Sequence, residues 1–249
     1  IAHLDTLRIG QTANVGSASG QFIMGAGSSV TTRSADIGMG SGGNGTLTVL
    51  GDALTFTGAD SALNFGTGTL EVPGTTFTVG SAAEALSALR IGYINSGTGP
   101  ATTAIDLSAS NPTFTAVVSE DLSIGRETGS NHYTTTAADG TLTLGSNSTI
   151  TLGTATNLAT LSIGWSQNTN GYSYGASATG RLDTTEGGFI AHLDTLRIGQ
   201  TANVGSANGT FVVGHGVALE TSVARIGVGS GATGTLTLLD SFTGTFNAA

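Results

Sequence analysis

The sequence predicts an all-β protein, a parallel β-solenoid (β-helix) of about seven complete three-strand coils of ~27–39 residues each. Three observations predict it: a short phrase that recurs at this period, apolar residues that alternate with Thr or Ser, and glycines spread evenly along the chain. Such a unit buries its apolar residues only by stacking on its neighbours, with strands ~4.8 Å apart.

The recurring phrase is "LRIG" or a variant of it, and every copy ends at a glycine. Successive marker glycines are 28, 28, 26, 33, 39, 35 and 28 residues apart, so seven intervals imply seven coils with a fragment at each end. Glycine suits a corner at which the chain turns with positive φ. The predicted corner glycines are Gly10, Gly38, Gly66, Gly92, Gly125, Gly164, Gly199 and Gly227.

The clearest unit, 139–164, contains three strand-like segments, "TLTLG", "STITLG" and "LATLSIG". Apolar residues alternate with Thr or Ser in each segment, the period of a strand with one buried face. Leu142 and Leu144 are therefore expected to face inward and Thr141 and Thr143 outward. Most of the nine phenylalanines are expected at inward positions, and examples are Phe22, Phe65, Phe77 and Phe211. The best helical candidate, 81–92, ends in the marker phrase, which favours a strand.

A β-sandwich or a propeller is the alternative all-β interpretation. It predicts antiparallel hairpins closed by two-residue Asn-Gly or Asp-Gly turns. Such dipeptides begin at Asn44, Asp139, Asn170 and Asn208. Three of the four precede the first strand of a coil, or its counterpart, rather than separating two paired strands, which favours the solenoid.

The chain also contains a long repeat. The opening "IAHLDTLRIGQTANVGSASG" returns at Ile190 with nineteen of twenty residues unchanged, at an offset of 189. We therefore interpret 1–249 as a single β-solenoid section, with a long repeat over 1–189 and a second copy beginning at 190. Neither end carries the polar cap that a free solenoid needs, so we expect a section of a longer repeat protein.

Composition excludes several classes of partner. The net charge is −9 and no basic stripe exists to neutralise phosphates, so we expect no nucleic acid. No apolar run is long enough to predict membrane insertion. The chain has no cysteine, so disulfides and thiolate metal sites are excluded. An acidic chain rich in Gly, Thr and Ser, with no lysine, indicates an extracellular or cell-surface protein of a bacterium.

Insertions gather at one point of the coil, between the marker glycine and the next first strand, over 93–100, 126–139 and 165–179. In stacked coils these loops lie side by side, and tyrosine and tryptophan concentrate at interfaces. We therefore predict a contact ridge for a glycan or for another protein; alternatively, the loops fold over their own coils. The candidate residues are Tyr93, His132, Tyr133, Trp165, Tyr172 and Tyr174.

The third strand also predicts an outward column of polar residues, two before each marker glycine: Arg8, Asp36, Asn64, Arg90, Ser123, Ser162, Arg197 and Arg225. Arg8 and Asp36 are expected to be neighbours on adjacent coils. An exposed pair of this kind is worth ~0–1 kcal/mol.

No catalytic residue, metal site or cofactor is predicted. Glu120–Asp121, the only adjacent acidic pair, is interpreted as a solvated corner, and nothing singles out Asp139 and Asp183 as a hydrolytic pair. His3 and His192 are copies of one position, about six coils apart, so they cannot share a metal. Repeated Thr-x-Thr motifs leave ice binding as a remote alternative.

The phrases "IGMGSGGNGTLTVLG" (37–51) and "IGVGSGATGTLTLLD" (226–240) resemble the glycine- and threonine-rich repeats of bacterial autotransporter passengers and PEP-CTERM-associated surface proteins. The resemblance implies a secreted β-solenoid used for adhesion or as a surface fibre, and it supplies no catalytic residues. The near-identical 189-residue repeat departs from an ordinary passenger.

We therefore predict an extracellular structural protein that forms a rigid surface filament, stalk or sheath. Its expected partners are copies of itself, or its own continuation end to end, with lateral filament contacts. The alternative is an adhesin passenger whose ridge binds a glycan or another surface protein. An enzyme is not expected.

Overall fold

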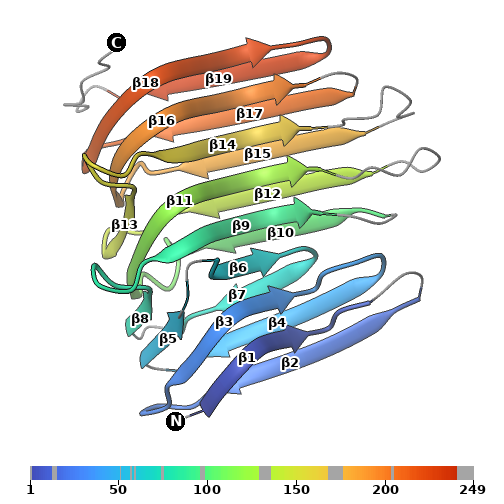
Figure 1. Cartoon of the computed structure of the whole chain (residues 1–249), viewed down its shortest axis with the longest axis vertical. Coiled ribbons are helices and arrows are strands. Elements are labelled where there is room, and N and C mark those ends of the chain that lie inside the picture. Colours follow the sequence, from blue (N-terminus) through green and yellow to red (C-terminus); the bar gives the residue numbers. More distant parts are fainter. Residues whose placement is uncertain are drawn as a thin grey trace.

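A computed structural model of the chain describes residues 2–12, 16–50, 52–56, 58, 60–73, 76–95, 99–128, 136–167, 176–202 and 205–239. These residues form nineteen β-strands and no helix, as the sequence predicted (Figure 1). The segment 81–92, the best helical candidate, leads into strand β9.

The largest sheet has eleven strands and contains the marker phrases. Its strands are β1 (Ala2–Ile9), β3 (Val30–Ile37), β5 (Asp52–Phe56), β6 (Ala62–Phe65), β8 (Thr76–Val79), β9 (Leu86–Ile94), β11 (Thr113–Glu127), β13 (Ser148–Leu152), β14 (Ala159–Ser166), β16 (Gly188–Thr201) and β18 (Val217–Val228).

Two smaller sheets lie behind the strands that carry the marker phrases (Figure 1). One consists of β2 (Ala18–Met24), β4 (Gly43–Val49) and β7 (Gly68–Glu71). The other consists of β10 (Ala101–Asp106), β12 (Ala137–Thr143), β15 (Ser177–Asp183), β17 (Ser206–Val213) and β19 (Ala232–Leu238). We call these two sheets together the back sheets.

Every pairing between the named strands is parallel. Paired residues lie about one marker interval apart, as in Arg8 opposite Asp36. Outside the named strands, the structure shows one antiparallel bridge, Thr154 to Asn157, within a turn. The alternative interpretation with antiparallel hairpins is therefore wrong, and the fold is all-β, parallel and solenoid-like.

Two of the three predicted segments are joined in the longest strands. β11 and β16 each run through what the sequence suggested were a second and a third strand. The register shifts at the junction of the two segments. In β11 the shift lies between Val118 and Asp121, and in the pairing of β14 with β16 it lies between Ala159 and Thr160. A bulge bends a strand without ending its ladder, so the predicted break becomes a bent strand.

One continuous hydrophobic core fills the space between the sheets and extends from Leu7 to Leu219. Leu142 and Leu144 are buried, while Thr141 and Thr143 are partly exposed, as the alternation predicted. Phe65, Phe77 and Phe211 are fully buried and Phe22 packs against the core from its edge. Aromatic rings on the paired strands β8 and β11 are in contact, and the centroids of Phe77 and Phe114 lie 5.8 Å apart with the rings tilted by 44°.

Seven of the eight marker glycines have φ between 60° and 64°. The exception is Gly66, where an added Cβ would instead collide with the backbone of Gly38. Five of the seven are not corners between strands, because the strand continues past them; these are Gly92, Gly125, Gly164, Gly199 and Gly227. Here the left-handed conformation bends the strand while the ladder continues on either side.

A second set of glycines faces these bends from the back sheets. Gly140, Gly180, Gly209 and Gly234 follow one another across paired strands. An added Cβ on Gly180 would meet the amide nitrogen of Gly164, and one on Gly164 would meet the carbonyl of Asn208. The Asn-Gly and Asp-Gly dipeptides that begin at Asn44, Asp139 and Asn208 therefore lie inside strands and let the two layers approach closely.

The back sheets are interrupted between β7 and β10. No strand pairing joins these two strands. Instead, the buried hydroxyl of Thr103 donates to the carbonyl of Gly66 at 2.6 Å and accepts from the amide of Gly68 at 3.2 Å. A side chain thus replaces the backbone bonds at this point, while the large sheet continues past it through β6 and β9.

The glycine bends give a direct test of this packing. We expect Gly199→Ala to lower the free energy of unfolding by about 3 kcal/mol or more, because its φ is 60° and its Cβ would overlap the carbonyl of Thr233. Gly27→Ala, with φ 75° and open space, should cost only about 1–2 kcal/mol. Gly25→Ala, with neither constraint, should stay within about 0.5 kcal/mol.

Urea unfolding midpoints measure the three variants on one scale. Equal losses in Gly199→Ala and Gly27→Ala would contradict the close approach of the two layers.

Candidate contact surface

The predicted contact ridge lies only partly within the described residues. Tyr93 is in β9 and only 8% exposed, and Trp165 is in β14 and partly exposed. Neither belongs to a loop, because β9 and β14 continue beyond their marker glycines. The other four ridge residues, His132, Tyr133, Tyr172 and Tyr174, lie outside the described residues.

Strand register brings Tyr93, Arg126 and Trp165 into one column, each directly after a marker glycine. The guanidinium carbon of Arg126 lies 5.9 Å from the centroid of the Tyr93 ring and 4.4 Å from that of Trp165. Arg90 covers Tyr93 at 5.1 Å and Arg197 covers Trp165 at 4.5 Å. Three cations and two aromatic rings thus alternate along the stack of strands, an arrangement that cation–π attraction favours.

A hydrogen-bonded chain extends this stack toward the N-terminal strands. Asn64 donates to Asp36 at 2.9 Å, and Arg90 donates to Asn64 at 3.1 Å. Asp121 then accepts from Arg90 at 3.0 Å and from Arg126 at 2.9 Å. All of these side chains except Asn64 are charged, so the bonds are of the stronger, charge-assisted kind.

The predicted column of polar residues is confirmed in its register, although two members, Ser123 and Ser162, are fully buried. Strand register aligns all eight of its members across β1, β3, β6, β9, β11, β14, β16 and β18. Arg8 and Asp36 are neighbours, with Nε and Oδ2 3.9 Å apart. The interpretation of Glu120–Asp121 as a solvated corner holds for Glu120, which is exposed, and is wrong for Asp121, which binds two arginines.

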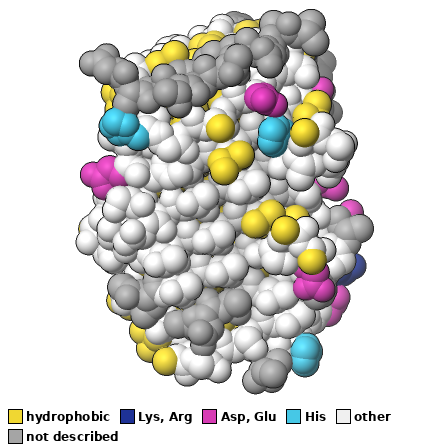
Figure 2. Space-filling view, turned by 90° about the vertical axis from the view of Figure 1, so that its left-hand side faces the viewer, with side chains coloured by type: hydrophobic (Ala, Val, Ile, Leu, Met, Phe, Trp, Pro, Cys, Tyr) yellow, Lys and Arg dark blue, Asp and Glu magenta, His cyan; other side chains and the backbone are white. Residues whose placement is uncertain are grey.

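We call this surface the arginine face. It consists of three columns of residues that run across these eight strands, one through Asp121, one through Arg90 and one through Trp165. Five of the seven arginines of the chain lie on it, with only two of the sixteen acidic residues, Asp36 and Asp121. Figure 2 shows the side formed by β5, β8 and β13, where the colour of arginine appears only at one margin.

Arg197 and Arg225 are neighbours on this face, on the paired strands β16 and β18. Partial burial, and then the positive charges of Arg225 and Arg126, lower the pKa of Arg197. Among the described residues neither arginine forms an ion pair, whereas Arg90 and Arg126 share Asp121. The charges of Asp121 and Asp194 act on Arg197 in the opposite direction but form no ion pair with it, so this end of the arginine face carries two neighbouring cations without a paired carboxylate among the described residues.

The stack decides how Trp165 can be used. Sugar rings bind tryptophan by stacking on the face of the indole. Two guanidinium groups already lie over the ring of Trp165, those of Arg126 and Arg197, which come from the strands on either side of β14. Trp165 therefore acts as a spacer between two cations and is not a platform for a glycan.

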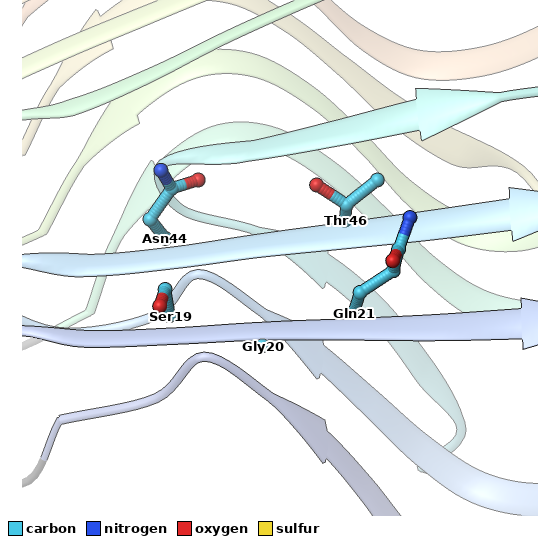
Figure 3. A pocket seen from close by; sticks show the side chains of 5 residues that line it. All are labelled: Ser19, Gly20, Gln21, Asn44 and Thr46. Atoms are coloured by element: carbon cyan, nitrogen blue, oxygen red, sulfur yellow. The ribbon is translucent and has the colours of Figure 1, made fainter.

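A shallow polar hollow lies on the back sheets, at β2 and β4 (Figure 3). Its lining residues are Ser19, Gly20, Gln21, Asn44 and Thr46. Ser19 pairs with Asn44 and Gln21 with Thr46 across the two strands. Hydroxyl and amide groups suit sugar hydroxyls, but the lining offers no aromatic ring on which a sugar could stack.

Asp139 and Asp183 are too far apart to form a hydrolytic pair. Asp139 pairs with Thr179 and Asp183 with Thr143, four residues further along the strands. This offset places the two carboxylates about 13–14 Å apart, since a strand rises ~3.3 Å per residue. A glycosidase needs its two carboxyl groups about 5–9.5 Å apart.

Across the described ranges no group of three metal-binding side chains occurs. No helix in these ranges is long and apolar enough to cross a membrane.

The Thr-x-Thr motifs occupy two different sides of the molecule. Those beginning at Thr46, Thr141 and Thr235 lie on the back sheets, whereas those at Thr113 and Thr149 lie on β11 and β13. On the back sheets the same columns hold Arg181 and Asp183. A broken column with charges does not form the flat, uniform array that ice binding requires.

Sequence reasoning missed the role of Arg126. The sequence did contain an indication of this role. Tyr93, Arg126 and Trp165 each follow a marker glycine directly, in three successive units, so they occupy equivalent positions. They had been assigned to loops because the glycine was expected to end the strand.

A scan against protein-family models, a search of curated proteins and a search of solved structures each found no match.

The contact between Arg197 and Trp165 is measurable by a double-mutant cycle. We expect Arg197→Met and Trp165→Leu to show a coupling of about 0.5–2 kcal/mol in unfolding free energy, because the guanidinium loses the ring beneath it. The cycle of Arg33→Met with Trp165→Leu is the control, since Arg33 pairs with Asp5 instead. Equal coupling in both cycles would contradict the stack.

Asp183 makes stability depend on pH. Burial acts to raise its pKa, but hydrogen bonds from Thr185 and Arg181 outweigh this and hold the pKa of Asp183 below its ordinary value of 3.8. A lowered folded pKa contributes stability above pH 3.8 that is lost as the pH falls through the folded value. We expect Asp183→Asn to be less stable at pH 7 and to lose less stability between pH 4 and pH 2. Parallel pH profiles of urea midpoints for the two proteins would refute this.

Proposed function

We propose that this chain is a section of an extracellular structural protein that forms a rigid surface filament, stalk or sheath. The observation that carries the proposal is the unbroken parallel ladder from β1 through β3, β6, β9, β11, β14 and β16 to β18. Each strand between β1 and β18 pairs its backbone with the strand before it and the strand after it, which gives stiffness along one axis.

In this proposal the strands are successive turns of one solenoid. The seven marker intervals correspond to seven complete coils, stacked at ~4.8 Å over roughly 35 Å. The long repeat of 189 residues then spans about six coils, from β1 to β16, which carry the same "AHLDTLRI". Repetition of this unit lengthens the fibre without altering its cross-section.

Side chains on both sides of the ladder support the mechanical role. The main hydrophobic core is one cluster that extends along the stack from Leu7 to Leu219. Outside, the chain from Asp36 through Asn64, Arg90 and Asp121 to Arg126 connects successive coils. Pulling along the axis would have to break these contacts together with the backbone bonds.

The alternative is an adhesin passenger that binds a glycan or another surface protein through the ridge over 93–100, 126–139 and 165–179. The polar hollow at β2 and β4 is the described feature that favours glycan contact. The sandwiched indole of Trp165 argues against it, because the strongest sugar-stacking side chain is occupied.

Electron microscopy and fibre diffraction of the native material distinguish the two proposals. We expect uniform fibres with an axial reflection at ~4.8 Å and a super-period of about six to seven coils. Discrete short rods that bind a glycan array with defined specificity would contradict the filament and favour the adhesin.

A further inference from the structure

Charge is distributed unequally around the stack. The arginine face holds five arginines and two acidic residues, so the rest of the chain holds two arginines and fourteen acidic residues. A chain with net charge −9 thus has one positive side and is strongly negative elsewhere. Copies of such a chain repel one another unless the arginine face takes part in the contact.

The back sheets are the flat surface of opposite sign. They carry Glu71, Asp106, Asp139 and Asp183, and their single arginine, Arg181, is already bound to Asp183 at 2.6 Å. Glu71, Asp106 and Asp139 are exposed. Hydrogen bonds from the side chain and the amide of Ser108 lower the pKa of Asp106, so its carboxylate is ionised at neutral pH.

The arginine face has unused charge at one end. Asp121 balances Arg90 and Arg126, and Asp36 lies beside Arg8. Arg197 and Arg225 form no ion pair among the described residues, although the charges of Asp121 and Asp194 act on Arg197. The guanidinium of Arg197 lies over the ring of Trp165, with its carbon 4.5 Å from the ring centroid, and a guanidinium held by stacking can still donate to a carboxylate.

We propose that the arginine face docks on the acidic back sheets of a second copy of this chain, so that neighbouring stacks pack side by side. This inference rests on the proposed function, and it names the lateral partner. The contact joins different surfaces, so each copy still offers a free arginine face or a free acidic back, and association continues into a row. Rows of stacks are the arrangement that a sheath requires.

Spacing supports a second copy as the partner. Charges on both surfaces sit on paired parallel strands, so both repeat in steps of ~4.8 Å along the stack. Arg197 and Arg225 are one step apart, and Asp106 and Asp183 are two steps apart in one column, through Thr143. Because both surfaces share this step, a carboxylate on the back sheets of a second copy can lie in register with Arg197 or Arg225.

Sedimentation at low ionic strength tests the contact. We expect self-association of the chain that weakens about tenfold in Arg197→Gln/Arg225→Gln and disappears at high salt. Arg33→Gln is the matched control, because Arg33 is exposed and lies off the arginine face; it should associate as the unaltered chain does. Arg181→Gln makes the acidic back more negative and should not weaken association. The fluorescence of Trp165, the only tryptophan, should change on association and report on this surface directly.

A charge exchange makes the test independent of any one variant. Asp106→Arg/Asp139→Arg and Arg197→Glu/Arg225→Glu should each fail to self-associate, while an equimolar mixture should associate. Circular dichroism and urea midpoints confirm that each variant is folded. If the mixture stays monomeric while both variants are folded, the proposal is overturned.

An acidic polysaccharide is the competing partner. Dextran sulfate is the probe: binding that needs Arg197 and Arg225, in a chain that does not self-associate, would overturn the second copy as the partner. Failure here is distinguishable from failure of the proposed function. Loss of side-by-side packing with the ~4.8 Å axial reflection retained would refute only the lateral contact, whereas loss of the reflection in the unaltered protein would refute the filament.

Discussion

Backbone pairing between parallel strands at a fixed spacing of ~4.8 Å is the constraint on which this structure depends. Each inner strand of the large sheet hydrogen-bonds its backbone to a strand on either side. Every turn of the chain therefore has to repeat the path of the turn before it. Where the path bends, the marker glycine adopts φ near +60° and a second glycine approaches from the back sheets. Length is free to vary only between these points, which is where the insertions occur.

The same constraint arranges side chains in columns. Inside, a column of apolar residues becomes a continuous core. Outside, a column of identical charges would repel itself, and the arginine face avoids this by placing Asp36, Asn64 or Asp121 between arginines and aromatic rings between guanidinium groups. Arg197 and Arg225 break the rule, because two cations follow one another. That break carries the inference that another molecule supplies the missing carboxylates.

Much of the fold was predictable from the sequence. The alternation of apolar residues with Thr or Ser identifies the strands, and the recurrence of the marker phrase, often after 28 residues, identifies which strands are paired and in which register. The neighbours Arg8 and Asp36 followed from that spacing alone. The joined strands β11 and β16 were not predictable, since a bulge and a strand break both appear as a lapse in alternation. The position of Trp165 was missed for a related reason: a glycine with positive φ was taken to end the strand, whereas the ladder continues past it. Four of the six predicted ridge residues lie outside the described residues, so the ridge itself stays a prediction.

The distance between the two copies of the long repeat tests the stacked ladder most directly. The chain has no cysteine, so His3→Cys/His192→Cys can be spin-labelled without further changes. These two positions are equivalent in β1 and β16 and lie six strand spacings apart along the stack. Pulsed electron paramagnetic resonance should give one main distance near ~29 Å, broadened by the label linkers. A distance below about 20 Å, as when the copies lie side by side, or several distances of equal weight, would contradict a single parallel stack.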